Sequence, residues 1–189
     1  MSHCFIINAR NERVVLIVQV LKDELRHKIL LESEHLFLQR GYDRTSLQMI
    51  ADKVNISKSN LYHYFKNKEE LFYELTDSAA DGLKRMILRF RSMRFDLNMD
   101  AQEFRMLLTE EVLSLLLAEK YGLLLIMEQA NGTRYENLRP VMIELIASKI
   151  VPMLADEENS PMMARIMARN LVDGTVHILK NRVRPSEVR

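Results

Sequence analysis

The apolar positions of the chain recur with the period of an α-helix from residue 22 onward. Leu25, Ile29 and Leu36 fall on one face with polar residues between them, which is the pattern of a helix with one buried side. Gly41 follows this stretch, and glycine readily takes the left-handed conformation that ends many helices. The pattern therefore predicts a first amphipathic helix over residues 22–40.

A second, short helix is predicted directly after it. Thr45 is followed three residues later by Gln48, the spacing of a capping box in which two side chains satisfy free N–H groups at a helix start. The apolar positions that follow are Leu47, Ile50, Ala51 and Val54. Their spacing places them on one face, so we expect a helix of about two turns.

Residues 55–57 (Asn-Ile-Ser) predict a tight turn into a third helix that starts at Lys58. The asparagine tolerates positive φ, and the serine can cap the helix that follows. Leu61 and Phe65, four residues apart, are expected to face inward. The other positions of this helix are polar or aromatic and are Ser59, Asn60, Tyr62, His63 and Tyr64. Two short helices joined in this way predict a helix-turn-helix over residues 45–65, whose second helix enters the DNA major groove.

A long helix and several further helices are predicted beyond this motif. Asn67 followed by Glu70 is a second capping pattern, and helical periodicity continues to Phe90. The later helices are predicted over residues 101–118, 121–130, 138–155 and 161–181. Pro152 is expected to kink or end one of them near Val151, because proline lacks an N–H group and clashes with the preceding turn.

This order of elements predicts an all-α fold with two domains. A three-helix module over residues 22–80 is followed by a helical domain over residues 81–189. Residues 14–21 (VVLIVQVL) are apolar, but a bilayer span needs roughly 20 residues, and no small-residue cleavage site follows. We interpret residues 1–21 as an N-terminal extension. Their different composition leaves a mis-assigned start codon as a second hypothesis for this segment.

The charge of the chain shows what kind of nucleic-acid contact is possible. The net charge of +1 argues against a protein that coats nucleic acid by bulk electrostatics, so any DNA contact must use a local basic surface. Residues 53–68 contain the lysines Lys53, Lys58, Lys66 and Lys68 and no acidic residue. A basic run of this length is also typical of a solvated helix face, so charge alone does not identify a DNA-binding surface.

The sequence gives no sign of metal, cofactor or catalytic chemistry. Cys4 is the single cysteine, which excludes an internal disulfide and fits a reducing, cytoplasmic setting. The five histidines do not have metal-ligand spacing. No glycine-rich phosphate loop, nucleophile elbow or HExxH motif is present. We therefore expect a protein that is not an enzyme, without a cofactor and without a membrane contact.

The candidate DNA-binding residues fall into three groups. Lys58, Ser59 and Asn60 lie at the start of the third helix, where side chains reach base edges, and Gln48 is a further candidate base reader. The phosphate candidates are Tyr62, Tyr64, Lys66 and Lys68, and His63 is placed at the rim. The N-terminus of the second helix, at Thr45 and Ser46, offers free N–H groups to a phosphate. The alternative for Tyr62 and Tyr64 is that they cover the core of the module.

Between Ile29 and Leu71 the sequence resembles the TetR/AcrR family of bacterial regulators. The shared pattern is IL-x-x-S-x-x-LF-x-x-x-GY-x-x-TSL-x-x-IA-x-x-x-x-ISKSNLYHYFKNKEEL. The positions that match family DNA contacts are Thr45, Ser46, Gln48, Lys58, Ser59, Asn60, Tyr62, Tyr64 and Lys68. Two departures are Glu32, where a small residue is usual, and Asn55 in place of a turn glycine. The resemblance implies a homodimer with an N-terminal DNA-binding domain and a helical domain for dimerisation and effector binding.

The second domain is rich in methionine, with ten of the twelve methionines between Met86 and Met167. Methionine adapts to irregular space, so an apolar effector pocket is one interpretation, and an ordinary helical core is the other. The pocket candidates are Phe90, Phe104, Tyr121, Met127 and Met142. The last two predicted helices are expected to form a four-helix bundle with a second copy, and Gly174 permits close approach there.

These patterns together predict a sequence-specific, DNA-binding transcriptional regulator, interpreted as a repressor that a small, largely apolar effector releases from a palindromic operator. The double-stranded operator, a second copy of the chain and this effector are its expected partners. The alternative is a helical interaction protein of the same fold that no longer binds an operator.

Overall fold

The computed structural model describes residues 4–92, 112, 114–154 and 158–182, and all the regular secondary structure in these ranges is helical. The elements are α1 (Cys4–Arg40), α2 (Leu47–Val54), α3 (Lys58–Tyr62), α4 (Lys68–Ser92), α6 (Lys120–Gln129), α7 (Leu138–Ile150), the 3-10 helix η1 (Val151–Met153) and α8 (Ser160–Arg182). The predicted all-α fold is confirmed for this part of the chain. Of the helix predicted over residues 101–118, only 112 and 114–118 are described, and they are helical.

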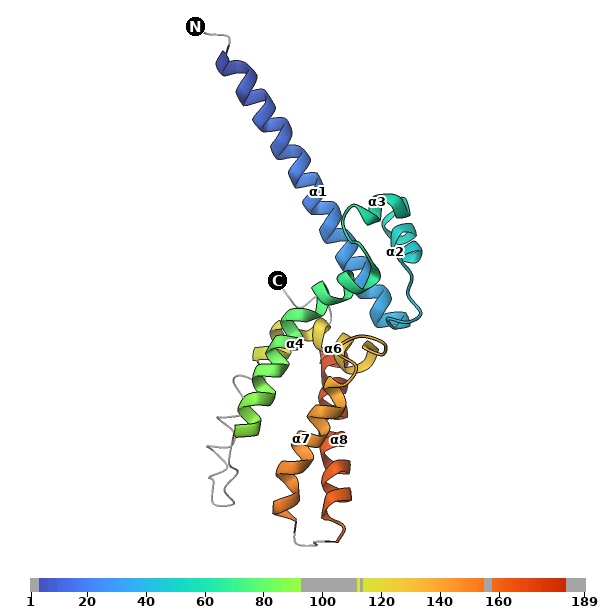
Figure 1. Ribbon diagram of the computed structural model, residues 1–189, viewed down its shortest axis with the longest axis vertical. Helices are drawn as coiled ribbons and strands as arrows, with labels where there is room; N and C mark the ends of the chain where they lie inside the picture. The colour runs from blue at the N-terminus through green and yellow to red at the C-terminus, as the bar shows by residue number, and fades with distance from the viewer. Residues whose placement is uncertain (1–3, 93–111, 113, 155–157, 183–189) are drawn as a thin grey trace.

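The first helix is longer than the sequence pattern predicts. α1 begins at Cys4, so the prediction of a helix start at residue 22 is wrong. Neither glycine nor proline occurs between residues 4 and 40, and nothing in this stretch therefore interrupts the helix. Figure 1 shows the N-terminal part of α1 projecting away from the rest of the molecule, while its C-terminal part lies beside α2 and α3.

The N-terminal module has an aromatic and aliphatic core. Ile29, Ile50, Leu61 and Phe72 have no exposed surface, and Phe37 packs edge-on against Phe72 with ring centroids 5.5 Å apart. The inward positions predicted for the first three helices are thus confirmed. Side chains of this size contribute about 1.5–3 kcal/mol each when they are buried, so α3 is held in place although it is only five residues long.

The breaks between helices follow the predicted signals. Gly41, at φ +89°, and Asn55, at φ +64°, take the left-handed conformation at the ends of α1 and α2. Gly132 takes the same conformation, at φ +75°, in the predicted turn after α6. α7 ends at Ile150 and continues as η1, which contains Pro152, so the predicted break near Val151 is confirmed.

The second domain is built on close contacts of α4 with α6 and of α7 with α8. α7 and α8 run side by side as a hairpin, and α4 leads from the N-terminal module into this domain (Figure 1). A Cβ atom on Gly122 would lie 2.8 Å from Ala79 Cβ and 3.0 Å from the Leu75 carbonyl oxygen. Only glycine therefore permits the observed crossing of α4 and α6.

Two negative findings apply to the residues that the structure describes. None of their helices combines the length and the apolar character needed to cross a membrane. No group of three or more His, Cys, Asp or Glu side chains among them lies close enough together to hold a metal ion.

Candidate nucleic-acid interface

The start of α2 is capped one residue later than the sequence predicts. Ser46 is the N-cap, and its hydroxyl oxygen accepts a hydrogen bond of 3.2 Å from the Met49 N–H. Thr45 is buried, and its hydroxyl donates to the Gly41 carbonyl oxygen at 2.8 Å. Gln48 donates to Asp52 Oδ1 at 2.7 Å instead of reaching back to the cap. The predicted Thr45–Gln48 capping box is therefore wrong, because the Thr45 hydroxyl satisfies a carbonyl at the end of α1.

The turn between α2 and α3 has the predicted geometry. Asn55 is left-handed, and the Ile56 N–H donates to the Ala51 carbonyl oxygen at 3.0 Å. Ser57 is the N-cap of α3, and its hydroxyl oxygen accepts from the Asn60 N–H at 3.1 Å. With Leu61 and Phe65 almost fully buried, the orientation of α3 against α2 is fixed.

Most of the predicted DNA-contacting side chains are accessible on the surface of the α2–turn–α3 unit. The exposed ones are Ser46, Gln48, Lys58, Ser59, Tyr62, His63 and Lys66, while Asn60 and Tyr64 are half-buried. The Lys58 ammonium lies 5.9 Å from the centre of the Tyr62 ring, so these two side chains lie close together on α3. Tyr62 does not cover the core, since 47% of its surface is exposed, whereas Tyr64 packs against the core.

Two of the predicted contacts have a structural role that the sequence does not reveal. The buried Thr45 side chain lies inside the module, so a contact between this side chain and DNA is not supported. Lys68 is half-buried and donates to the Tyr42 carbonyl oxygen at 2.7 Å. Its burial lowers the pKa of the ammonium group from its usual value. An ammonium has three N–H donors, so this bond leaves Lys68 only a reduced capacity for a phosphate.

The start of α4 confirms the second predicted capping pattern. The Glu70 N–H donates to Asn67 Oδ1 at 2.7 Å, and Glu70 Oε2 accepts from the Lys66 N–H at 2.7 Å. These bonds satisfy two backbone donors that the helix itself leaves without partners. The Lys66 backbone is therefore held in place while its side chain remains exposed.

An apolar cavity of about 420 Å³ lies in the second domain between α4, α6, α7 and α8. Three of the predicted pocket residues, Phe90, Met127 and Met142, line it. Tyr121 does not: it is 36% exposed, and the Lys120 ammonium lies 5.0 Å from its ring centre. The prediction for Tyr121 is therefore wrong, because the cavity-facing positions of α6 are Leu123 and Met127. Phe104 lies outside the described residues.

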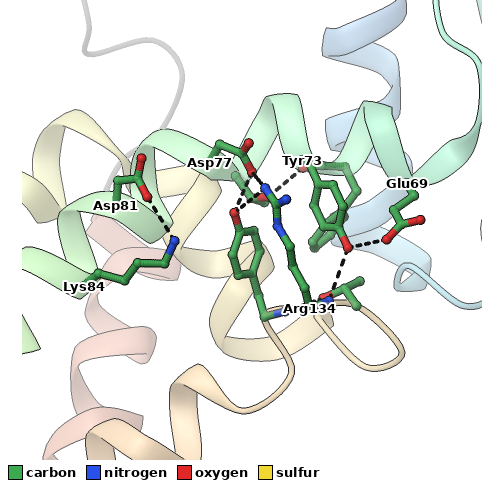
Figure 2. Close-up of polar contacts among 10 residues, drawn as sticks. Glu69, Tyr73, Asp77, Asp81, Lys84 and Arg134 are labelled. Atoms are coloured by element: carbon green, nitrogen blue, oxygen red, sulfur yellow. Dashed lines mark hydrogen bonds and ion pairs between the residues drawn. The ribbon is translucent and has the colours of Figure 1, made fainter.

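Sequence reasoning missed a polar cluster between α4 and the loop that joins α6 to α7 (Figure 2). The Arg134 guanidinium donates to Asp77 Oδ1 at 2.6 Å and stacks 3.8 Å from the Tyr73 ring centre. The Tyr135 hydroxyl donates to the same Asp77 oxygen at 2.6 Å. Burial and this bond raise the pKa of Tyr135 to about 12. Such contacts join residues more than fifty positions apart, and no local sequence pattern indicates them.

The comparisons with known proteins agree with the helix-turn-helix geometry. The family model described as "Bacterial regulatory proteins, tetR family" matches residues 29–75. The biofilm operon icaADBC HTH-type negative transcriptional regulator IcaR of Staphylococcus epidermidis is 34% identical over 65 residues, which are 34% of this chain and 35% of IcaR. The HTH-type transcriptional activator FasR of Mycolicibacterium smegmatis is 34% identical over 62 residues, which are 33% of this chain and 28% of FasR. The match thus spans about a third of these curated relatives.

Two solved structures are similar to the chain over most of its length. NalD, the secondary repressor of the MexAB-OprM multidrug efflux pump in Pseudomonas aeruginosa, is 22% identical, with a TM-score of 0.46 over 85% of this chain and 86% of NalD. AmtR of Mycobacterium smegmatis is 17% identical, with a TM-score of 0.43 over 82% of this chain and 85% of AmtR. Because both TM-scores are below 0.5, the similarity to a known family rests on the match over residues 29–75. Residues 29–75, the part of the chain that carries the helix-turn-helix, are similar to the tetR family of bacterial regulatory proteins.

Proposed function

We propose that the chain is a sequence-specific transcriptional repressor that binds a palindromic operator as a homodimer and is released by a small, largely apolar effector. The observation that carries this proposal is the α2–turn–α3 unit, in which two capped helices hold an exposed polar face in a fixed orientation. The family match over residues 29–75 supports the same function. The proposal places the chain in the cytoplasm, where bacterial operator DNA lies.

In this proposal the first turn of α3 reads the bases. Lys58 and Ser59 are exposed at its N-terminus, and Asn60 is half-buried beside them. A lysine can donate to guanine O6 and N7, and an asparagine can bind adenine N6 and N7, so these positions can discriminate base pairs in the major groove. Gln48, held by Asp52 on α2, is a further candidate reader.

Phosphate groups are proposed to bind around the same face. The N-terminus of α2 presents backbone N–H groups behind the Ser46 cap, and the helix dipole favours a negative charge there. Tyr62 and Lys66 are exposed at and beyond the end of α3 and can donate to phosphate oxygens, with His63 at the rim. Such contacts set the register of the protein on DNA without reading its sequence.

The proposed dimer interface is an apolar stripe on α8. Met163, Met167, Leu171 and Ile178 are each about half exposed. The first three are four residues apart, and Ile178 follows Leu171 after seven residues, with Gly174 between them on the same face. A monomer seldom exposes such a continuous apolar stripe, and a second α8 would bury it. A two-fold dimer would place two recognition helices about 34–36 Å apart, in successive major grooves.

The proposed effector acts through α4. The cavity is lined by Leu83, Met86, Ile87 and Phe90 of this helix, whose first residue, Lys68, is bonded to the DNA-binding module. A ligand that prefers one position of α4 would change the separation of the two recognition helices. Only a difference in affinity between the two states is needed to shift operator occupancy.

The test is selection of bound DNA from a random pool, followed by gel-shift titration of the enriched sequence. We expect an inverted repeat, weaker binding by about 1–3 kcal/mol for Lys58→Ala or Asn60→Ala, and unchanged binding for Lys84→Ala on α4. Binding without sequence preference would defeat the proposal and favour the interaction-protein alternative. IcaR is described as a negative regulator and FasR as an activator, so a reporter assay on the selected operator decides the sign of regulation.

A further inference from the structure

The cavity in the second domain extends along the helices that enclose it. Its described lining covers residues 83–90 on α4, residues 142–150 on α7 and residues 171–179 on α8. A helix rises 1.5 Å per residue, so each of these stretches is about 10–12 Å long. A ligand that contacts all of this lining therefore has an elongated shape.

The described lining contains only two polar side chains, Lys149 on α7 and Thr175 on α8. The Arg139 guanidinium at the start of α7 donates to Asp173 Oδ1 of α8 at 2.5 Å, which aligns these two residues. Thr175 is two residues from Asp173, whereas Lys149 is ten residues from Arg139, about 15 Å along α7. The two polar groups are therefore well separated along the cavity, and the rest of the described wall is apolar.

The charge of Lys149 is already engaged. Its ammonium group donates a hydrogen bond of 3.2 Å to the Arg91 carbonyl oxygen and takes part in a further interaction, so it is not free for a ligand. Its aliphatic stem belongs to the apolar wall. No aspartate or glutamate is among the described lining residues. Neither an anion nor a cation therefore meets an available opposite charge in this lining.

Thr175 offers a ligand one hydrogen-bond acceptor. Its hydroxyl donates to the Leu171 carbonyl oxygen at 2.8 Å, so its hydrogen is used within α8. The oxygen can still accept a hydrogen bond, and the residue is half-buried at the cavity wall. A ligand group that donates one hydrogen bond fits this oxygen, whereas a group that only accepts does not.

These features select a ligand by its polar group. A carboxylate or an ammonium group would lose hydration without gaining a partner, and an unpaired charge is costly to bury. A hydroxyl group is neutral and can donate the one bond that Thr175 accepts. A neutral hydrogen bond of this kind changes an affinity about fivefold.

We infer that the cavity binds an uncharged lipophilic alcohol, whose elongated apolar part lies against the walls and whose hydroxyl donates to Thr175 Oγ1. Only the role of this ligand as the effector rests on the proposed function. Thr175 is then the residue that distinguishes an alcohol from an ether of the same length.

The test is a calorimetric titration of the full-length protein with four probes: 1-decanol, its isomer 1-methoxynonane, decanoate and decyltrimethylammonium. All are kept below their solubility limits and below the concentrations at which they form micelles. The ether has the same atoms as the alcohol but no hydrogen-bond donor. We expect decanol to bind about fivefold more tightly than the ether and about tenfold more tightly than either charged probe.

Variants locate the site. Thr175→Val keeps the shape of the side chain and should abolish the preference for decanol over the ether, and Thr175→Ser should retain it. Ser148→Ala is the matched control, because the Ser148 hydroxyl also donates to a carbonyl of its own helix, that of Leu145 at 2.7 Å, but Ser148 is exposed and outside the described lining. It should leave all affinities unchanged. Met142→Trp, which narrows the cavity, should weaken both uncharged probes.

Several outcomes would overturn the inference: equal or tighter binding of a charged probe, equal binding of decanol and the ether, a decanol preference that persists in Thr175→Val, or no binding of any probe. If Thr175→Val does not fold, the probe series on the wild type and on Thr175→Ser still decides. A gel-shift titration keeps the proposed function separate. Decanol that binds in a Thr175-dependent way without changing operator affinity would support the ligand class and contradict its role as effector.

Discussion

The Lys68 ammonium group donates a hydrogen bond of 2.7 Å to the Tyr42 carbonyl oxygen and lies 4.0 Å from the centre of the Tyr42 ring. Lys68 is the first residue of α4, and Tyr42 follows the glycine that ends α1. The Tyr42 ring in turn packs against Phe72, with centroids 5.0 Å apart. The helix that leads into the second domain is thus attached to the corner between α1 and α2 by polar and aromatic contacts together.

Replacing Lys68 by methionine should therefore lower the free energy of unfolding by about 1–2 kcal/mol. The change removes a half-buried, charge-assisted hydrogen bond and a cation–π contact but keeps the aliphatic stem. Urea denaturation monitored by circular dichroism measures this change in the free energy of unfolding. Lys66→Met is the matched control, since Lys66 is exposed, and it should change stability by less than about 0.5 kcal/mol. Equal effects of the two substitutions would show that the Lys68 contact does not stabilise the fold.

The position of the α2 cap gives a second prediction. Ser46→Asp should leave the stability nearly unchanged, because aspartate is as good an N-cap as serine and its charge favours a helix N-terminus. Thr45→Asp should cost several kcal/mol, because it puts a carboxylate into a buried position that now holds a hydroxyl bonded to the Gly41 carbonyl oxygen. Thermal melts at one pH compare the variants. If Ser46→Asp lowered the melting temperature more than Thr45→Asp, Thr45 and not Ser46 would be the N-cap of α2.

Local signals predicted the fold well where a single residue decides the backbone. Gly41 and Asn55 end helices because of the φ values that they tolerate, and Pro152 ends α7 because it lacks an N–H group. Thr45 shows where this reasoning fails. Both Thr45 and Ser46 are good caps by residue type, and the choice depends on the carbonyl groups that α1 places nearby, which no local pattern encodes.

In the candidate site, too, some positions could be predicted from local sequence and others depend on contacts between distant segments. Exposure of Lys58 and Ser59 follows from helical spacing, since Leu61 and Phe65 fix the buried face of α3. The sequence does not show that Tyr121 points away from the cavity, because the rotation of α6 depends on Gly122 packing against α4. Contacts between distant segments determine that rotation, as they determine the Arg134 cluster.

The Asp77–Arg134 pair is expected to connect α4 to the loop after α6. Asp77→Ala removes the acceptor of both Arg134 and Tyr135 and should cost about 1–3 kcal/mol, whereas Asp77→Asn keeps an acceptor and should cost less. Chemical denaturation gives both values. A double-mutant cycle with Arg134→Met isolates the pair, and additive single effects would show that the two residues do not interact.

Tyr135 should make the protein less stable at alkaline pH. Its pKa is raised to about 12, above the ordinary value of 10, so the folded chain holds a proton that the unfolded chain releases between these values. The contribution is therefore complete below pH 10 and is lost as the pH rises toward 12. In Tyr135→Phe the unfolding free energy should fall less steeply over this range. An identical slope in the variant would contradict the raised pKa.

Replacing Gly174 should have opposite effects on the stability of a single chain and on the stability of the proposed dimer. A Cβ atom at this position meets nothing within 4 Å, so alanine should stabilise α8 in an isolated chain by about 1 kcal/mol. In a dimer whose backbones approach closely at Gly174, the same methyl group would lie in the interface and weaken association. We therefore expect Gly174→Ala to raise the dimer dissociation constant in analytical ultracentrifugation.

The monomeric reference for this test is Ile178→Glu, which puts a charge on the exposed apolar stripe of α8. It should abolish the dimer because an unpaired carboxylate would be buried in the interface. Adding Gly174→Ala to this variant should raise its melting temperature, since only the helix propensity then remains. A dimer that tolerates both substitutions would place the interface on another surface and exclude α8 as the contact between the two copies.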